Sequence, residues 1–174
     1  MLVLVVWACG GLLGEKSTRD DTAVGGDSAT SIFPESGRMV GVTEAHNVVR
    51  REYDVPDLTY DTSLEVVSAD WIAHLASNGC ILEHNWDSPL GENLFWSNYP
   101  ASPDAVVESW ASEVQYYDYE SNSCDPGQMC GHYTQIIWST TERVGCSVGA
   151  CDDGSEIWMC NYDPPGNMVG VLPY

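Results

Sequence analysis

Positively charged residues are scarce in this 174-residue chain. It contains 6 Lys and Arg against 26 Asp and Glu, which gives a formal net charge of −20 at neutral pH. A surface of this charge repels phosphate backbones and anionic lipid head groups. The composition therefore excludes nucleic acid as a partner. Cations, neutral lipids and neutral polymers remain possible partners. Alternatively, the negative charge serves only to keep the protein soluble.

Long hydrophobic runs are missing as well, so no transmembrane helix is predicted. The apolar run at residues 1–8 is too short to span a bilayer, and it lacks the basic residues that begin an ordinary signal peptide. The stretch Val6-Trp7-Ala8-Cys9 is similar to the processing site of bacterial lipoproteins, in which the cysteine becomes lipidated. We expect residues 1–9 to be a remnant of such a signal, with Cys9 as a lipid anchor and the only membrane attachment. A plain secretory signal is the alternative.

Cysteine, in contrast, is abundant. Six of the seven cysteines lie between Cys80 and Cys160, and the seventh is Cys9. An even set in a chain of this size indicates a disulfide framework formed in an oxidising compartment. The protein is therefore expected to be secreted or held at the outer cell surface.

The chain divides into a tether and one domain. Residues 10–38 are rich in Gly, Ser, Thr and Asp without a sustained period, which predicts a flexible acidic tether. Residues 39–174 have enough apolar and aromatic residues for one packed core. We expect this domain to be a monomer.

Apolar spacing predicts three helices within the domain. The first carries Ala45, Val48, Val49 and Tyr53 and ends before Pro56, and the second runs from a capping box at residues 62–65 to Gly79. The third is expected to begin at Ser102-Pro103 and continue to about Tyr117. Its stripe of Val106, Trp110, Glu113 and Tyr117 places a carboxylate among apolar side chains. Such a carboxylate either has a buried partner or reaches out to solvent.

Beyond Cys130 the pattern changes to that of strands. Strands are predicted at residues 132–138, 143–148 and 156–162, with a hairpin turn at Asp152-Asp153-Gly154. A three-residue turn would set Cys146 opposite Cys160, close enough for a bridge. Helices followed by antiparallel strands indicate a layered α+β fold.

Several short motifs resemble one family and occur in its order. They are His46-Asn47-Val48-Val49-Arg50, Gly91-Glu92-Asn93-Leu94, Trp110-Ala111-Ser112-Glu113, the run GHYTQIIWSTTERVGC at 131–146, and Cys160-Asn161-Tyr162-Asp163 followed by PPGN. The chain is identified by them as a member of the CAP superfamily of cysteine-rich secretory, antigen 5 and pathogenesis-related 1 proteins. Its pattern is most similar to the plant pathogenesis-related 1 proteins, apart from the lipoprotein-like start.

This resemblance implies a three-layer α-β-α sandwich with a central antiparallel sheet. It also implies three disulfides, which join Cys80 to Cys151, Cys124 to Cys130, and Cys146 to Cys160. The Cys124–Cys130 bridge closes a short loop. The Cys80–Cys151 bridge closes a long loop, and under the chain-entropy model it stabilises the fold by about 4 kcal/mol.

The resemblance further implies a cleft lined by His84, Glu92, Glu113 and His132. Two imidazoles and two carboxylates can bind a divalent cation such as Zn²⁺, with the two His as ligands; they can transfer protons; or they can form a purely structural network. The spacing does not decide among these uses, because no two ligands have the separation of a helical zinc motif. No cofactor is required by the pattern.

Catalysis has weaker support than binding. The sequence contains no G-x-S-x-G motif, and no cysteine nucleophile remains once the six domain cysteines pair. A metal-dependent, protease-like hydrolase and a cell-surface protein-interaction module are the alternatives to a non-enzymatic binding protein.

The tyrosine-rich segment after the third predicted helix resembles a loop with which family members bind sterols and related lipids. Tyr116, Tyr117 and Tyr119 would supply large apolar faces with polar tips to a small sterol-like ligand. The other interpretation is that these tyrosines only cover the core. The segment 164–174 similarly resembles a peptide released from plant relatives, but we expect it simply to close the last strand.

Overall fold

The computed structural model describes residues 35–174. The predicted signal remnant, Cys9 and most of the predicted tether lie outside this range, so the lipid anchor stays a prediction. The elements are η1 (Gly37–Met39), α1 (Val42–Arg51), β1 (Thr59–Tyr60), α2 (Thr62–Ser77), β2 (Gly91–Ser97), α3 (Pro103–Ala111), η2 (Ser112–Tyr116), β3 (Tyr117–Asp118), β4 (Ser123–Cys124), α4 (Gly131–Ile136), β5 (Arg143–Ala150) and β6 (Glu156–Asp163). In the described residues, no helix is long and apolar enough to cross a membrane.

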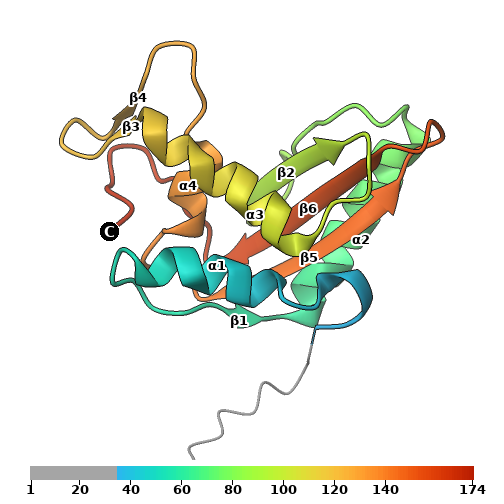
Figure 1. Ribbon diagram of the computed structural model, residues 1–174, viewed down its shortest axis with the longest axis horizontal. Helices are drawn as coiled ribbons and strands as arrows, with labels where there is room; N and C mark the ends of the chain where they lie inside the picture. Colours follow the sequence, from blue (N-terminus) through green and yellow to red (C-terminus); the bar gives the residue numbers. More distant parts are fainter. Residues whose placement is uncertain (1–34) are drawn as a thin grey trace, which may run out of the picture. The chain divides into compact units, whose positions relative to one another are not determined.

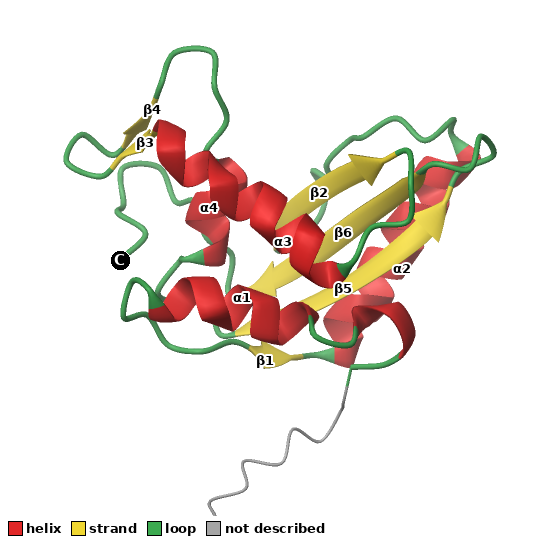
Figure 2. Ribbon diagram, in the orientation of Figure 1, coloured by secondary structure: helices red, strands yellow, loops and turns green. Residues whose placement is uncertain are grey.

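A four-stranded sheet forms the middle of three layers (Figures 1 and 2). The strand order is β1-β5-β6-β2; β2, β6 and β5 are antiparallel neighbours, whereas the short edge strand β1 runs parallel to β5. Helix α2 packs on β5 and β6 from one side, and α1, α3 and α4 cover the other (Figure 1). The predicted three-layer α+β sandwich is confirmed, but the sheet is mixed rather than wholly antiparallel.

The two faces of the sheet are buried in separate cores because successive strand residues point to opposite faces. In β6, Trp158, Cys160 and Tyr162 face the core beneath α1, α3 and α4, while Ile157 and Met159 face α2. Strand β6 is buried almost throughout, as expected of the central strand.

Glycines in β5 allow α2 to lie unusually close to the sheet. A Cβ atom on Gly145 would come within 2.3 Å of the Glu65 main-chain nitrogen, and one on Gly149 within 2.3 Å of an Ile72 methyl carbon. Ser68 on the same helix is fully buried and donates a hydrogen bond to the carbonyl of Gly145. The small residues in RVGCSVGA are therefore required by helix packing.

The helices begin where the sequence predicted. Ser102 caps α3 by accepting a hydrogen bond from the Ala105 N–H, and Pro103 opens that helix. Helix α2 begins at Thr62, although Asp61 rather than a residue of the capping box supplies the cap. Helix α1 is also present, but its fully buried side chains are mostly polar.

The third helix, predicted to continue to about Tyr117, ends as α3 at Ala111 and is followed by the 3-10 helix η2 up to Tyr116. Two further elements differ in type from the prediction. Residues 132–138 were predicted as a strand, but Gly131–Ile136 form the helix α4. All residues from Tyr133 to Trp138 are buried, and a segment buried on every side has no polar face to reveal its period. Conversely, no element was predicted between Gly79 and Ser102, yet Gly91–Ser97 forms the seven-residue strand β2, which pairs with β6. Its Gly and Asn residues hid its strand character.

The structure contains all three predicted disulfides. Cys80–Cys151 joins the end of α2 to the end of β5, Cys124–Cys130 closes the short segment before α4, and Cys146–Cys160 bridges directly opposed residues of β5 and β6. The predicted hairpin register is therefore correct.

The first contacts of the folded domain come before Met39. The carboxylate of Glu35 accepts hydrogen bonds from the Gly41 and Thr43 N–H groups at the start of α1, and Arg38 forms an ion pair with Glu156 and packs over the Trp158 ring.

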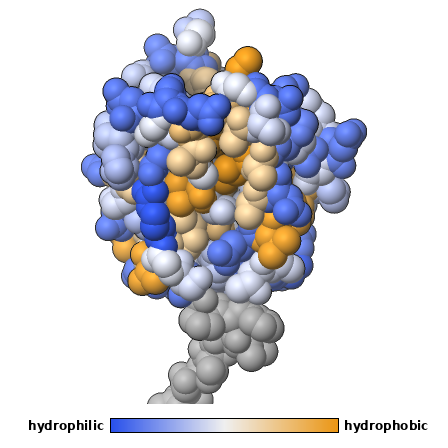
Figure 3. Space-filling model, turned by 90° about the vertical axis from the view of Figure 1, so that its right-hand side faces the viewer, coloured by the Kyte–Doolittle hydropathy of each residue, from blue (hydrophilic) through white to orange (hydrophobic). Residues whose placement is uncertain are grey.

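At the end of the molecule where β2 and β5 finish, apolar residues form a strip between hydrophilic ones (Figure 3).

Candidate functional site

An open cleft of about 600 Å³ lies between the segment that follows α2 and the start of α4. Its lining combines both imidazoles of the predicted tetrad with a carboxylate, several uncharged polar groups and three large apolar side chains. The lining residues are His84, Asn85, Trp86, Ser88, Leu90, Glu92, Met129, Gly131, His132 and Asn167. The structure thus brings His84, Glu92 and His132 to one cavity, and Glu113 contacts His132 from behind.

Glu113 fixes the position of His132. Its Oε1 accepts a hydrogen bond of 2.6 Å from the Nδ1 of His132, and its Oε2 accepts bonds from the N–H groups of His132 and Tyr133. Those N–H groups lie in the first turn of α4 and have no partner within the helix, so Glu113 caps the helix from a distant segment. The side chain is only 14% exposed. The carboxylate therefore points inward and has a partner, as one of the two sequence interpretations required.

Glu92 plays the matching part for His84. Its Oε1 accepts bonds from the Nδ1 of His84, at 2.9 Å, and from the main-chain N–H of Asn85. His84 lies in the loop after α2, which is held by a hydrogen bond from the Trp71 indole to the carbonyl of Glu83. Glu92 lies on β2 and is almost completely buried, whereas His84 is 40% exposed.

These two His–Glu pairs decide which atoms the cleft offers to a ligand. A hydrogen bond from Nδ1 to a carboxylate requires a proton on Nδ1, so in the neutral ring Nε2 is an acceptor or a metal ligand. Within residues 35–174, Nε2 of neither His84 nor His132 has a protein partner. In that range no group of three or more His, Cys, Asp or Glu is arranged to hold a metal. A cation bound here would thus have two imidazole ligands and would take its others from water or from a bound molecule.

A buried chain of hydrogen bonds supports the cleft from below. The carbonyl of Val42 accepts from Nδ1 of His46, so Nε2 of His46 accepts from the Tyr162 hydroxyl. Asn93 then donates both to that hydroxyl and to the carbonyl of His132. Burial lowers the pKa of His46 to about 4, consistent with a neutral ring. The motif histidine of α1 thereby contributes to the position of a cleft histidine.

Several residues of the site were not predicted. Trp86 is 83% exposed and its ring lies edge-on to His84 at 5.6 Å, while Met129 stands exposed among the same lining residues. Trp110, predicted only as a core residue, stacks against His132 with the ring centroids 6.1 Å apart. A solitary Trp in the polar loop NWDSPL was the one sequence signal for these apolar residues of the site.

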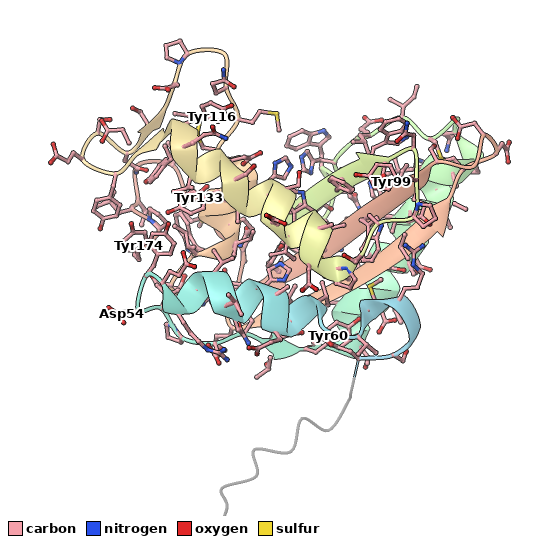
Figure 4. The ribbon with its side chains drawn as sticks, in the orientation of Figure 1. Asp54, Tyr60, Tyr99, Tyr116, Tyr133 and Tyr174 are labelled. Atoms are coloured by element: carbon pink, nitrogen blue, oxygen red, sulfur yellow. A yellow bond between two sulfur atoms is a disulfide. The ribbon has the colours of Figure 1, made fainter. Side chains whose placement is uncertain are left out.

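The predicted lipid loop lies elsewhere. The ring of Tyr117 packs on Tyr133 and its hydroxyl donates to Asn122, and Tyr119 stacks on Tyr174 and donates to its carbonyl. Figure 4 shows Tyr116, Tyr133 and Tyr174 at the same end of the molecule. None of the three predicted loop tyrosines lines the cleft. Two of them contact residues of the protein itself, and the proposal that they bind lipid remains to be tested.

The segment after β6 packs against this same region (Figure 1). Asn167 accepts a hydrogen bond from Thr134, the carbonyl of Val171 accepts one from Asn122, and the carbonyl of Pro173 accepts one from the Ser139 N–H. These bonds agree with the expectation that residues 164–174 close the fold after the last strand.

Comparison with known proteins agrees with this architecture. The family model described as "Cysteine-rich secretory protein family", or CAP, matches residues 43–162. The pathogenesis-related protein PR-1 of Medicago truncatula is 44% identical over 130 residues, which are 74% of each chain, and protein 1C of Nicotiana tabacum is 42% identical over 132 residues, covering 75% and 77%.

Solved structures show the same fold. Venom allergen-like protein 4 of Schistosoma mansoni has a TM-score of 0.63 at 22% identity, covering 77% of this chain and 91% of its own. NaASP2, solved with Zn²⁺, also has a TM-score of 0.63 at 23% identity, and the match covers 76% of this chain and 82% of NaASP2. The family match spans most of the folded region. The chain therefore belongs to the CAP family of cysteine-rich secretory proteins.

Proposed function

We propose that this protein is a non-enzymatic extracellular binding protein whose cleft takes a small amphipathic, lipid-like ligand and a divalent cation. Family membership and three disulfides fit a secreted protein. The observation that carries the proposal is the composition of the cleft, in which two carboxylate-oriented imidazoles share one cavity with Trp86, Leu90 and Met129. A cavity with an apolar wall and a few oriented polar groups is typical of a small-molecule site.

The cation part of the proposal rests on the two His–Glu pairs. A histidine that binds a metal commonly donates its other N–H to a carboxylate, and both cleft histidines do so. A structure of NaASP2 was determined with Zn²⁺, which lends support by analogy of fold. Two imidazoles suit Zn²⁺ better than Ca²⁺ or Mg²⁺, which prefer oxygen ligands.

We expect the purified protein to bind Zn²⁺ in isothermal titration calorimetry and the His132→Gln variant to bind it at least about 10-fold more weakly, because one of two ligands is lost. His74→Gln is the matched control, since His74 is exposed on α2 and outside the cleft. Undiminished Zn²⁺ binding by a variant that lacks both His84 and His132 would place the cation elsewhere.

The lipid part of the proposal has two candidate surfaces, the cleft and the tyrosine loop. We favour the cleft, because its apolar wall is exposed while Tyr117 and Tyr119 are engaged within the protein. A fluorescent sterol should therefore bind about 10-fold more weakly to Trp86→Ala than to wild type, which corresponds to loss of one aromatic contact of roughly 1.4 kcal/mol. Tyr119→Ala is the comparison. If it alone weakens binding, the ligand occupies the loop.

A further inference from the structure

The cleft contains a buried acceptor without a donor. Glu92 lines the cavity with its side chain 6% exposed, and its Oε1 takes the bonds from His84 and Asn85. Its Oε2 is buried and has no hydrogen-bond partner within the described residues. A buried carboxylate oxygen without a donor is unfavourable, so this atom is poised to accept from a bound molecule.

Positive side chains do not reach the cleft from the described part of the chain. Residues 35–174 contain no lysine and four arginines, against 22 Asp and Glu. Each arginine is committed to partners inside the fold. Arg38 pairs with Glu156, Arg51 with Glu44 and Asp57, Arg143 with Asp61 and Asp163, and Arg50 bonds to main-chain carbonyls. A carboxylate or phosphate head group would therefore meet a negative field and no arginine or lysine of the described range.

The apolar side chains of the cleft suit both a cation and an aliphatic chain. Trp86 is the most exposed of the large apolar residues that line the cleft, and Leu90 and Met129 continue the apolar surface. An indole face attracts ammonium groups and also packs against hydrocarbon. These side chains can thus hold an aliphatic chain, while Glu92 accepts hydrogen bonds from a charged head.

We propose that the preferred ligand of the cleft is a cationic amphiphile, a protonated primary amine carried on an aliphatic chain. This inference rests on the proposed function and specifies the head group of its ligand. The ammonium donates to Oε2 of Glu92, and the chain lies along Trp86 and Leu90. An alcohol of the same chain length can donate only a neutral hydrogen bond, and a carboxylate can donate none, so affinity should fall in that order.

The test is titration of the full-length protein with octylamine, 1-octanol and octanoate, three probes that share one chain and differ only in the head. We expect octylamine to bind at least about 10-fold more tightly than 1-octanol, the ratio that corresponds to a charge-assisted against a neutral hydrogen bond. Octanoate should bind more weakly than either.

Two variants separate the contact from the overall charge. Glu92→Gln keeps an acceptor for His84 and Asn85 but replaces Oε2 by an NH₂ donor, so the preference of octylamine over 1-octanol should disappear. Glu83→Gln removes the same charge from an exposed neighbour that does not line the cleft, and the preference should persist. Thermal unfolding of both variants checks that they fold.

The outcomes distinguish this inference from the proposed function. If the three probes bind equally, or if Glu92→Gln retains the preference for octylamine, the head-group assignment is wrong while the amphiphile-binding cleft stands. If no probe binds to wild type, the apolar ligand of the proposed function is overturned as well.

Discussion

Replacing Arg50 with methionine is expected to lower the free energy of unfolding by about 4 kcal/mol or more. Arg50 is fully buried, and its guanidinium donates to the carbonyls of Pro56, Ile136, Trp138 and Thr141. Burial lowers its pKa to about 10, so it remains charged at neutral pH. Methionine fills part of the space but leaves four carbonyls without that donor, each at a loss of about 1 kcal/mol or more.

Urea unfolding with the disulfides intact measures this effect. Arg50→Lys should recover only part of the loss, because an ammonium cannot reproduce the planar fork that reaches carbonyls in different directions. Arg51→Met is the matched control: its side chain is exposed, its ion pairs with Glu44 and Asp57 are on the surface, and the unfolding midpoint should hardly change. Similar midpoints for the Arg50 and Arg51 variants would contradict the structural role assigned to Arg50.

Arg50 also shows what hydrophobic periodicity can and cannot reveal. Ala45, Val49 and Tyr53 correctly located helix α1, yet these residues are only partly buried and Val48 is exposed. The fully buried face of α1 consists mainly of His46, Asn47 and Arg50. Polar residues at helical spacing ordinarily mark a solvent-exposed face, and only the positions of distant carbonyl and hydroxyl groups reverse that expectation. Those positions cannot be read from the helix itself.

The candidate site, like helix α1, was only partly predictable from the sequence. Glu113 was singled out from its place on an apolar stripe, which left a buried partner and an exposed carboxylate as alternatives, and the structure shows the buried partner. The family resemblance, rather than the period, grouped His132 with His84 and Glu92, and the structure places the three in one cavity although the segment of His132 was predicted as a strand. Trp86 and the unpartnered Oε2 of Glu92 were not foreseen. The conformation of the loop after α2 decides how far the Trp86 side chain is exposed and which oxygen of Glu92 receives hydrogen bonds from that loop.

His46 gives the second large effect, an acid-dependent loss of stability. The ring is fully buried between the carbonyl of Val42 and the hydroxyl of Tyr162. The neutral form suits both, because its Nε2 accepts from the hydroxyl; with Asn93 already donating to that oxygen, a protonated Nε2 would leave the buried hydroxyl proton without an acceptor. Burial is the main reason that its pKa falls to about 4 in the folded protein, from 6.5 in an unfolded chain.

Between these two pKa values the unfolded chain binds a proton that the folded protein does not. The contribution of His46 is therefore complete above pH 6.5 and is lost progressively as the pH falls toward 4, by about 3 kcal/mol in total. We expect wild type and His74→Gln to show this loss in urea unfolding measured at a series of pH values. In His46→Gln the group is absent, so the variant should be less stable at pH 7 but lose less on acidification. Equal losses in wild type and His46→Gln would show that the acid sensitivity has another source. A smaller acid loss in His46→Gln would show that the neutral ring of His46, which holds Tyr162 and through Asn93 the carbonyl of His132, links the stability of the fold to the geometry of the cleft.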